Sequence, residues 1–213
     1  MDRRHFHISS FVAVAAPWAG LTPVQAQGGP VEGKDFLRLG QPLAVAAGPK
    51  VEVVEFFGYW CPHCNVFEPM LEAWVRKLPP EVSFRRIPVQ FNPTHEIYQR
   101  LYFAIEALNL IEALHRKVFA AIHQDRKRLD KEADIQALLA ASGVDAPKVL
   151  ETMKSFSVLS KVRQAKQLTE AYKVDGVPMI GVHGRFTTSL GMAGGPERVL
   201  QVTEQLIQLT RKS

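Results

Sequence analysis

The stretch Glu55-Phe56-Phe57-Gly58-Tyr59-Trp60-Cys61-Pro62-His63-Cys64 decides the fold of this chain of 213 residues. With Val51-Glu52-Val53-Val54 before it, it begins as a strand of the near-continuous apolar kind that is covered on both faces. The cysteine pair follows at once, and apolar residues at helical spacing then continue up to Pro79-Pro80. A further strand is predicted at 82–89, so the order indicates a β-α-β unit with parallel strands.

The chain has two cysteines, and both lie in this stretch. With 46% apolar and 22% charged residues, the composition fits one or two globular domains and excludes a disordered, a collagen-like or a disulfide-stapled small protein. The formal net charge is +5. The basic residues are separated from one another by acidic residues or by helical spacing, and no aromatic residues alternate with them. We therefore expect no nucleic-acid partner.

The N-terminus has the pattern of a cleaved export signal. Arg3 and Arg4 precede an apolar run over 11–21, and Val24-Gln25-Ala26 is a small-x-small cleavage site, so cleavage is expected near Ala26. The run is too short to span a membrane and contains Pro17. The arginine pair also resembles a twin-arginine signal, and both routes lead to an oxidising compartment. The mature chain is expected to be soluble, without stable membrane insertion.

The rest of the chain predicts an all-helical block between strands. A short edge strand is expected at 36–39, before the first long strand. Apolar residues then recur at helical spacing from Ile97 to Tyr172. Strands are predicted at 179–182 and 185–188, joined by a His183-Gly184 turn, and a last helix runs from Pro196 to about Leu209.

The position of Cys61 predicts a reactive thiol. It falls at the start of a helix, where unpaired backbone N–H groups and the positive end of the helix dipole favour a thiolate. Pro62 suits the first helical turn, and His63 can add positive charge or a hydrogen bond. A stabilised thiolate makes a disulfide easy to reduce, so the pair acts as an oxidant. Cys61 is expected to be the exposed, attacked cysteine, and Cys64 the shielded cysteine that resolves the mixed disulfide.

Other uses of the cysteine pair are less well supported. A structural zinc ion requires four ligands, and neither a second C-x-x-C nor a convincing set of histidines completes such a site. A structural disulfide across three residues closes a very small loop and stabilises little. We expect redox catalysis without a metal or an organic cofactor.

Glu55 lies in the predicted buried strand, where a carboxylate is costly unless it has a partner or a task. In one interpretation it pairs with a cation such as Arg86 on the neighbouring strand. In the other it is a buried acid of raised pKa that carries a proton to or from Cys64. The two interpretations are compatible.

Val177-Pro178 precedes the strand predicted at 179–182. An X-Pro bond is trans in most proteins, so the sequence does not fix its isomer. If this strand lies beside the cysteine helix, a cis proline would hold a backbone edge against the disulfide, and Val177 would pair with an extended substrate.

These motifs, the helical insertion and the export signal resemble the thioredoxin superfamily and, within it, the DsbA family of periplasmic thiol:disulfide oxidants. The resemblance implies a thioredoxin-like α/β fold with an inserted all-helical subdomain. It implies a nucleophile at Cys61, a resolving thiol at Cys64, a tuning His63 after Pro62, a buried acid at Glu55 and a cis-proline substrate loop at Val177-Pro178. Arg86 stands where the family can carry a lysine. The extra disulfide of some relatives has no counterpart here.

The expected organisation follows from this resemblance. Residues 1–26 are the signal peptide, 27–40 a flexible N-terminus with the edge strand, 41–93 and 174–213 the two thioredoxin-like parts, and 94–173 the helical insertion.

The expected function is a periplasmic dithiol oxidase that donates its disulfide to reduced, extended exported polypeptides. A DsbB-type inner-membrane quinone reductase would reoxidise it. A monomer is expected. Two alternatives stay open: a disulfide reductase or isomerase of the same fold, and a peptide-binding chaperone.

Overall fold

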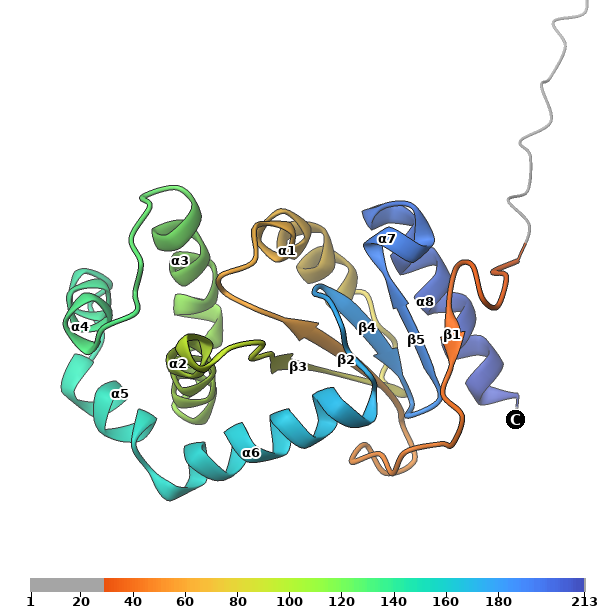
Figure 1. Ribbon diagram of the computed structural model, residues 1–213, viewed down its shortest axis with the longest axis horizontal. Coiled ribbons are helices and arrows are strands. Elements are labelled where there is room, and N and C mark those ends of the chain that lie inside the picture. Colours follow the sequence, from red (N-terminus) through yellow and green to blue (C-terminus); the bar gives the residue numbers. More distant parts are fainter. Residues whose placement is uncertain (1–28, 213) are drawn as a thin grey trace, which may run out of the picture.

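The computed structural model describes residues 29–212, so the predicted export signal at 1–26 lies outside the described residues. Five strands form one sheet in the order β1-β5-β4-β2-β3 (Figure 1). They span Leu37–Arg38 (β1), Val51–Phe57 (β2), Val82–Pro88 (β3), Met179–Val182 (β4) and Phe186–Ser189 (β5). β2 pairs with β3 in parallel and with β4 antiparallel, which places the strand before the cysteine pair at the centre of the sheet.

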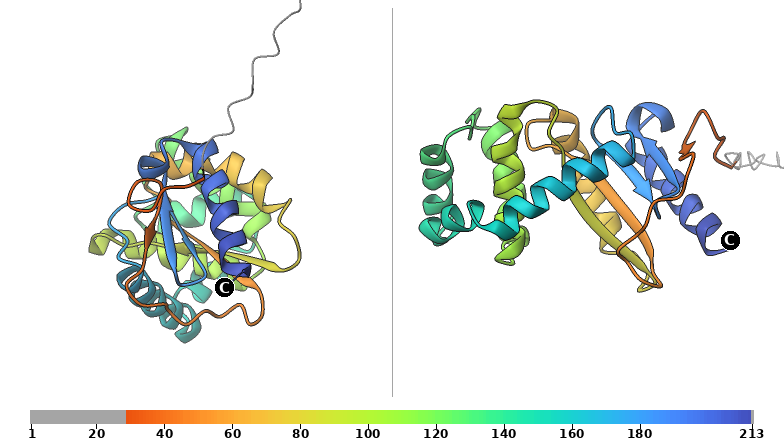
Figure 2. Two further views of the ribbon diagram at one scale, coloured as in Figure 1. Left: turned by 90° about the vertical axis from the view of Figure 1, so that its right-hand side faces the viewer. Right: turned by 60° about the horizontal axis from the view of Figure 1, so that its bottom comes forward.

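Helix α1 (Pro62–Val75) follows β2, and five helices separate β3 from β4. The five span Glu96–Ala107 (α2), Ile111–His123 (α3), Glu132–Ala141 (α4), Ala146–Met153 (α5) and Phe156–Ala171 (α6), after a short 3₁₀ turn at Pro93–His95. The chain ends with α7 (Leu190–Ala193) and α8 (Pro196–Arg211). Figure 2 shows α6 running from the helical block back to the sheet.

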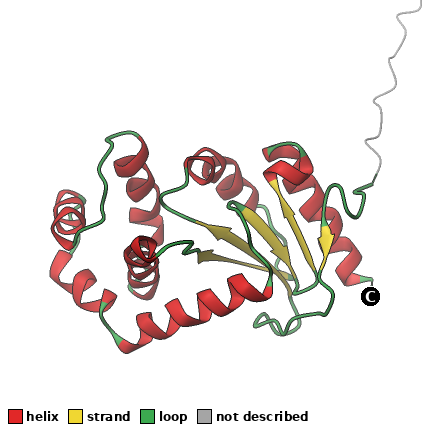
Figure 3. Cartoon of the chain, viewed as in Figure 1, coloured by secondary structure: helices red, strands yellow, loops and turns green. Residues whose placement is uncertain are grey.

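The two faces of the sheet pack against different helices (Figure 3). Val51 and Val53 of β2 share one apolar cluster with residues of α1 and α8. Val54 and Phe56 point the other way, because side chains alternate along a strand, and pack in the cluster that includes α2 to α6. The polar residues of β2 are divided in the same way, so Glu52 and Glu55 belong to opposite faces.

The predicted fold class is confirmed: an α/β sheet interrupted by an all-helical block. The hairpin at His183-Gly184 is also confirmed, with φ of 50° and 63° at its two central residues. The short helix α7 was not predicted, and the helix after Cys61 ends at Val75 rather than near Leu78. Within the described residues, no helix is both long enough and apolar enough to cross a membrane.

Candidate active site

Cys61 is the N-cap residue of α1, and the helix itself begins at Pro62. Its backbone is extended (φ −88°, ψ 118°), and its Sγ accepts a hydrogen bond from the Cys64 N–H at 3.4 Å. Its own N–H donates to the Gly58 carbonyl at 3.0 Å, which closes a tight turn between β2 and α1. Pro62 has no N–H to leave unpaired in this first turn. The sequence therefore places one sulfur where the helix start offers its free donors.

The two thiols have opposite acidities. The pKa of Cys61 falls from 9.0 to about 6, chiefly because it accepts a hydrogen bond from the Cys64 thiol, with further help from the backbone N–H groups of Cys64 and His63 and from the His63 charge. Burial raises the pKa of Cys64 well above its usual range, and the Cys61 and Glu55 charges add to this. Near pH 7, Cys61 is a thiolate and Cys64 a thiol.

The expectation that Cys61 is exposed is wrong for this structure. Only 3% of the residue is accessible, against none of Cys64. Its Sγ lies 3.3 Å from the Val177 carbonyl oxygen, to which the protonated thiol donates a hydrogen bond, and the Val177–Pro178 bond is cis. The loop before β4 therefore lies directly against the sulfur, and the sequence gives no measure of how closely two distant loops approach.

A groove beside Cys61 is open to solvent. It has a volume of about 600 Å³ and lies between the first turn of α1, the loop before β4 and the segment around α7. Its lining includes His63, Val177, Pro178, Met179 and Leu190. Three of the predicted site residues, His63, Val177 and Pro178, thus line this groove, and Cys61 lies beside it through its contact with Val177. Cys64 and Glu55 are buried in the core.

Glu55 is fully buried in β2, opposite Arg86 of β3. Its Oε2 lies 3.0 Å from Arg86 Nε, which confirms the predicted ion pair. Neither carboxyl oxygen has a hydrogen bond from another described residue. Burial, followed by the Glu68 charge, raises the pKa of Glu55 from 4.5 to about 8, although Arg86 acts in the opposite direction. Glu55 can therefore gain or lose a proton near neutral pH.

A second buried glutamate, Glu68 of α1, shares the same arginine. Arg86 Nη2 is hydrogen bonded to Glu68 Oε1. The other oxygen, Oε2, lies 3.4 Å from Nε2 of His115 on α3. The cluster under the cysteines thus contains two carboxyl groups, one guanidinium and one imidazole, all of them nearly inaccessible to solvent.

The comparisons with known proteins agree with this geometry. A family model described as a DSBA-like thioredoxin domain matches residues 52–206, which is more than half of the chain. The chain belongs to this family. The match begins within β2, includes both cysteines and the whole helical block, and ends within α8.

Individual members of the DsbA family support the assignment. The thiol:disulfide interchange protein DsbA of Azotobacter vinelandii is 41% identical over 181 residues, covering 85% of each chain. That of Pseudomonas syringae pv. tomato is 40% identical over 205 residues, covering 96% of this chain and 95% of its own. The crystal structure of Pseudomonas aeruginosa DsbA superposes with a TM-score of 0.82 at 38% identity, covering 84% of this chain and 94% of that one. Like these relatives, this DsbA-family chain is a thiol:disulfide oxidoreductase.

Sequence reasoning missed two members of this DsbA-family site, Glu68 and His115. Glu68 follows Cys64 by four residues and precedes Leu71 by three, so it falls on the buried stripe of α1. His115 lies beside Leu114 and four residues before Phe119, on the buried face of α3. A polar residue on an apolar stripe is the signal that identifies both.

Proposed function

We propose that this oxidoreductase is a periplasmic dithiol oxidase, which transfers its Cys61–Cys64 disulfide to reduced, extended polypeptides that have just been exported. The observation that carries the proposal is the difference in acidity between the two cysteines. A pKa of about 6 at Cys61 means that reduction of the disulfide yields a stabilised thiolate near pH 7. A couple whose reduced form is stabilised is a strong oxidant, and DsbA is the standard example of such a couple, so the strength of the oxidant comes from the family and not from the geometry.

The reaction begins when a substrate thiolate attacks Cys61 of the oxidised protein. A bond forms between the substrate sulfur and Cys61 Sγ, the Cys61–Cys64 bond breaks, and Cys64 leaves as a thiolate. Because burial raises the pKa of Cys64, this thiolate takes a proton, and the protonated Glu55 is the acid that supplies it. A second substrate thiolate then attacks the first substrate sulfur, which completes the substrate disulfide and releases Cys61 as a thiolate.

The groove beside Cys61 supports the choice of an extended polypeptide as substrate. When Cys61 carries its proton, the Val177 carbonyl accepts the S–H of the thiol. Neither the Cys61 thiolate nor Cys61 in a mixed disulfide has an S–H to donate, so in both states this carbonyl can accept from a backbone N–H of the substrate. His63 and Pro178 line the same groove, which supports a role for both in substrate binding, beside the role of His63 in tuning Cys61.

Reoxidation runs the same chemistry in reverse. Cys61 attacks a disulfide of a DsbB-type membrane partner linked to quinones, Glu55 then accepts the Cys64 proton, and the Cys64 thiolate attacks Cys61 Sγ to restore the disulfide. No step requires a metal or an organic cofactor. The periplasm, the export signal and a monomeric state belong to the same proposal.

The test is an oxidative refolding assay. Residues 27–213 are added in the oxidised form to a second protein whose native disulfides have been reduced. Stoichiometric oxidised protein is expected to restore the activity of the refolding protein, while Cys61→Ser and Cys64→Ser restore none. A couple as reducing as thioredoxin, with an ordinary Cys61 pKa of about 8.5, would instead assign the protein to the reductases. Activity that survives Cys61→Ala would assign it to the chaperones.

A further inference from the structure

Helix α3 contacts the active-site loop through two histidines. His115 Nδ1 lies 2.7 Å from the Tyr59 hydroxyl, and His123 Nε2 lies 2.8 Å from the Tyr59 carbonyl. Phe119, one helical turn from each histidine, packs edge-on against the Tyr59 ring at 5.0 Å. Tyr59 precedes Cys61 by two residues, so the helical block contacts the loop that carries the nucleophile.

The hydrogen bond to Tyr59 fixes the proton positions on His115. Burial raises the pKa of Tyr59 well above its usual range, so the phenol keeps its proton. We assign the phenol as the donor to Nδ1, because the other ring nitrogen, Nε2, faces a carboxyl oxygen of Glu68 and therefore carries the ring hydrogen. Burial also lowers the pKa of His115, which keeps the imidazole neutral. A neutral ring that accepts at Nδ1 carries its hydrogen on Nε2. This nitrogen lies 3.4 Å from Oε2 of Glu68.

The contact between His115 and Glu68 is long, but no other described residue forms a hydrogen bond with either of the two atoms. Nε2 and Oε2 are 3.4 Å apart, which is an ion-pair distance without the geometry of a hydrogen bond. Neither atom has a hydrogen bond to any other residue that the structure describes, and the two residues are 1% and 0% exposed. Polar atoms so deeply buried are normally satisfied, so these two are each other's remaining partner.

We propose that His115 is a positioning residue of the thiol–disulfide reaction, whose neutral imidazole holds the Tyr59 hydroxyl with one nitrogen and the Glu68 carboxylate with the other. The proposal rests on the proposed function and adds a residue to it. His115 touches neither sulfur, and it acts through the groups that it orients.

The route from His115 to the chemistry passes through Arg86. The guanidinium is divided between Glu68 and Glu55. When Glu68 also accepts from the imidazole N–H, its own interaction with the guanidinium is weaker. The guanidinium then stabilises the Glu55 carboxylate more strongly. Loss of that N–H draws Arg86 toward Glu68 and raises the pKa of Glu55. The charged and titratable groups that face His115 are Tyr59 from the loop, Glu68 and Glu72 from α1, Arg86 from β3 and Tyr102 from α2.

The test isolates the step in which Cys64 attacks. Reduced protein reacts with 5,5′-dithiobis(2-nitrobenzoate), which leaves one nitrobenzoate sulfur bonded to Cys61. Cys64 gives its proton to Glu55 and attacks Cys61 Sγ. The Cys61–Cys64 bond forms, the bond to the probe breaks, and the probe leaves as a coloured thiolate that carries the two electrons. The rate of this second release is measured as a function of pH. The midpoint of the profile reports the pKa of the base that accepts the proton, which for Glu55 is about 8.

Three variants separate the polar role of His115 from its packing. His115→Phe keeps an aromatic ring but loses both nitrogens. His115→Gln keeps one donor and one acceptor. His123→Gln is the matched control, because it changes the same helix and the same tyrosine contact without facing the carboxylates.

We expect the midpoint to rise by at least about half a pH unit in His115→Phe and to stay within about 0.2 of the wild-type value in His115→Gln and His123→Gln. A midpoint in His115→Phe that is unchanged or lower overturns the proposal. So does an equal rise in either glutamine variant.

Two further results keep the test decisive. If His115→Phe does not fold, Tyr59→Phe takes its place, with a smaller rise expected and an unmoved midpoint overturning the proposal. If the wild-type protein releases no second thiolate, the proposed function itself fails. A normal wild-type profile that His115→Phe leaves unmoved overturns the positioning role alone.

Discussion

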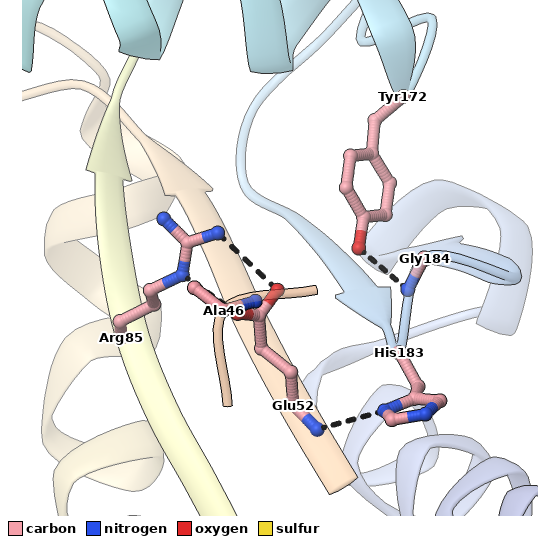
Figure 4. A network of polar contacts seen from close by, with 6 residues as sticks. All are labelled: Ala46, Glu52, Arg85, Tyr172, His183 and Gly184. Carbon is pink, nitrogen blue, oxygen red and sulfur yellow. Dashed lines mark hydrogen bonds and ion pairs between the residues drawn. The ribbon is translucent and has the colours of Figure 1, made fainter. Parts of the chain in front are cut away.

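Two glutamates on β2, Glu52 and Glu55, each meet an arginine of β3, and their surroundings differ. Glu52 accepts from Arg85 Nε and Nη2 at 3.2 Å each and from the Ala46 N–H at 3.2 Å (Figure 4). Its own N–H donates to His183 Nδ1 at 3.3 Å, and its carbonyl accepts the His183 N–H at 2.7 Å. Glu55 has one ion-pair contact, to Arg86, and no hydrogen bond to either carboxyl oxygen among the described residues.

The difference shows that burial alone does not decide how a carboxyl group is held. The two residues are 2% and 0% exposed, and both face a guanidinium. What separates them is the number of donors. Three N–H groups donate to the Glu52 carboxylate, two from Arg85 and one from Ala46, so this side chain connects β2 with β3 and with the loop before β2. Glu55 shares its single cation with Glu68, so burial dominates and its pKa rises to about 8.

The largest expected effect is the difference in stability between a variant that lacks Arg86 and one that lacks Arg85. Arg86→Met leaves Glu55 and Glu68 without their cation and is expected to cost about 3–5 kcal/mol of unfolding free energy near pH 8. The loss is smaller near pH 5, because Glu55, whose pKa is raised by burial, is then protonated and needs no cation. Arg85→Met is the control, with a cost of about 1 kcal/mol because the Arg85 side chain is partly exposed. Urea unfolding at both pH values measures this, and equal costs would contradict the comparison.

The next effect is the pH dependence of stability. The folded reduced protein keeps a proton on Glu55 between pH 4.5 and about 8 that the unfolded chain releases. The stability due to this proton is complete below about pH 4.5 and is lost as the pH rises through about 8, a fall of about 2–4 kcal/mol. In Glu55→Gln this fall is expected to disappear, and in Glu52→Gln to persist. Calorimetry or urea unfolding over this range provides the measurement.

The chemistry provides a third test. Glu55→Gln removes the base that we propose takes the Cys64 proton, so release of the second thiolate from the nitrobenzoate adduct is expected to slow about 10- to 100-fold near pH 8. The fold should remain intact, as judged by circular dichroism. A rate equal to that of the wild type across the pH range would assign the proton to another group.

The smallest effect is the loss of the Glu52 charge. Glu52→Gln keeps the shape of the side chain but weakens its contacts with Arg85, at an expected cost of about 1 kcal/mol in urea unfolding. The thiol chemistry and its pH midpoint are expected to match the wild type. A slower second release in this variant would show that the two glutamates are not distinct in role.

Much of the fold was predictable, because the signals are local. The strand at 51–57, the helix start after Cys61 and the hairpin at His183-Gly184 each follow from residues close together in the sequence. The Glu55–Arg86 pair was also predictable, because parallel neighbours in a β-α-β unit bring these residues side by side.

The rest of the site depends on how distant elements pack. Whether Glu68 or another polar residue of α1 meets Arg86 depends on the rotation of the helix over the sheet. The contact of His115 with Glu68 depends on where the helical block docks, and the same is true of its hydrogen bond to Tyr59. The burial of Cys61 depends on the approach of Val177, more than a hundred residues away. No local pattern contains these distances.

Cys61 is both the proposed nucleophile and the N-cap of its helix, and this has a consequence for hydrogen exchange. The Cys64 amide donates to Cys61 Sγ. A thiolate is a stronger acceptor than a sulfur bonded to a second sulfur, so the first turn of α1 is held most firmly in the reduced protein. Local opening is what exposes an amide to solvent deuterium. The Cys64 amide should therefore exchange more slowly after reduction, so that one backbone position reports the redox state of the protein.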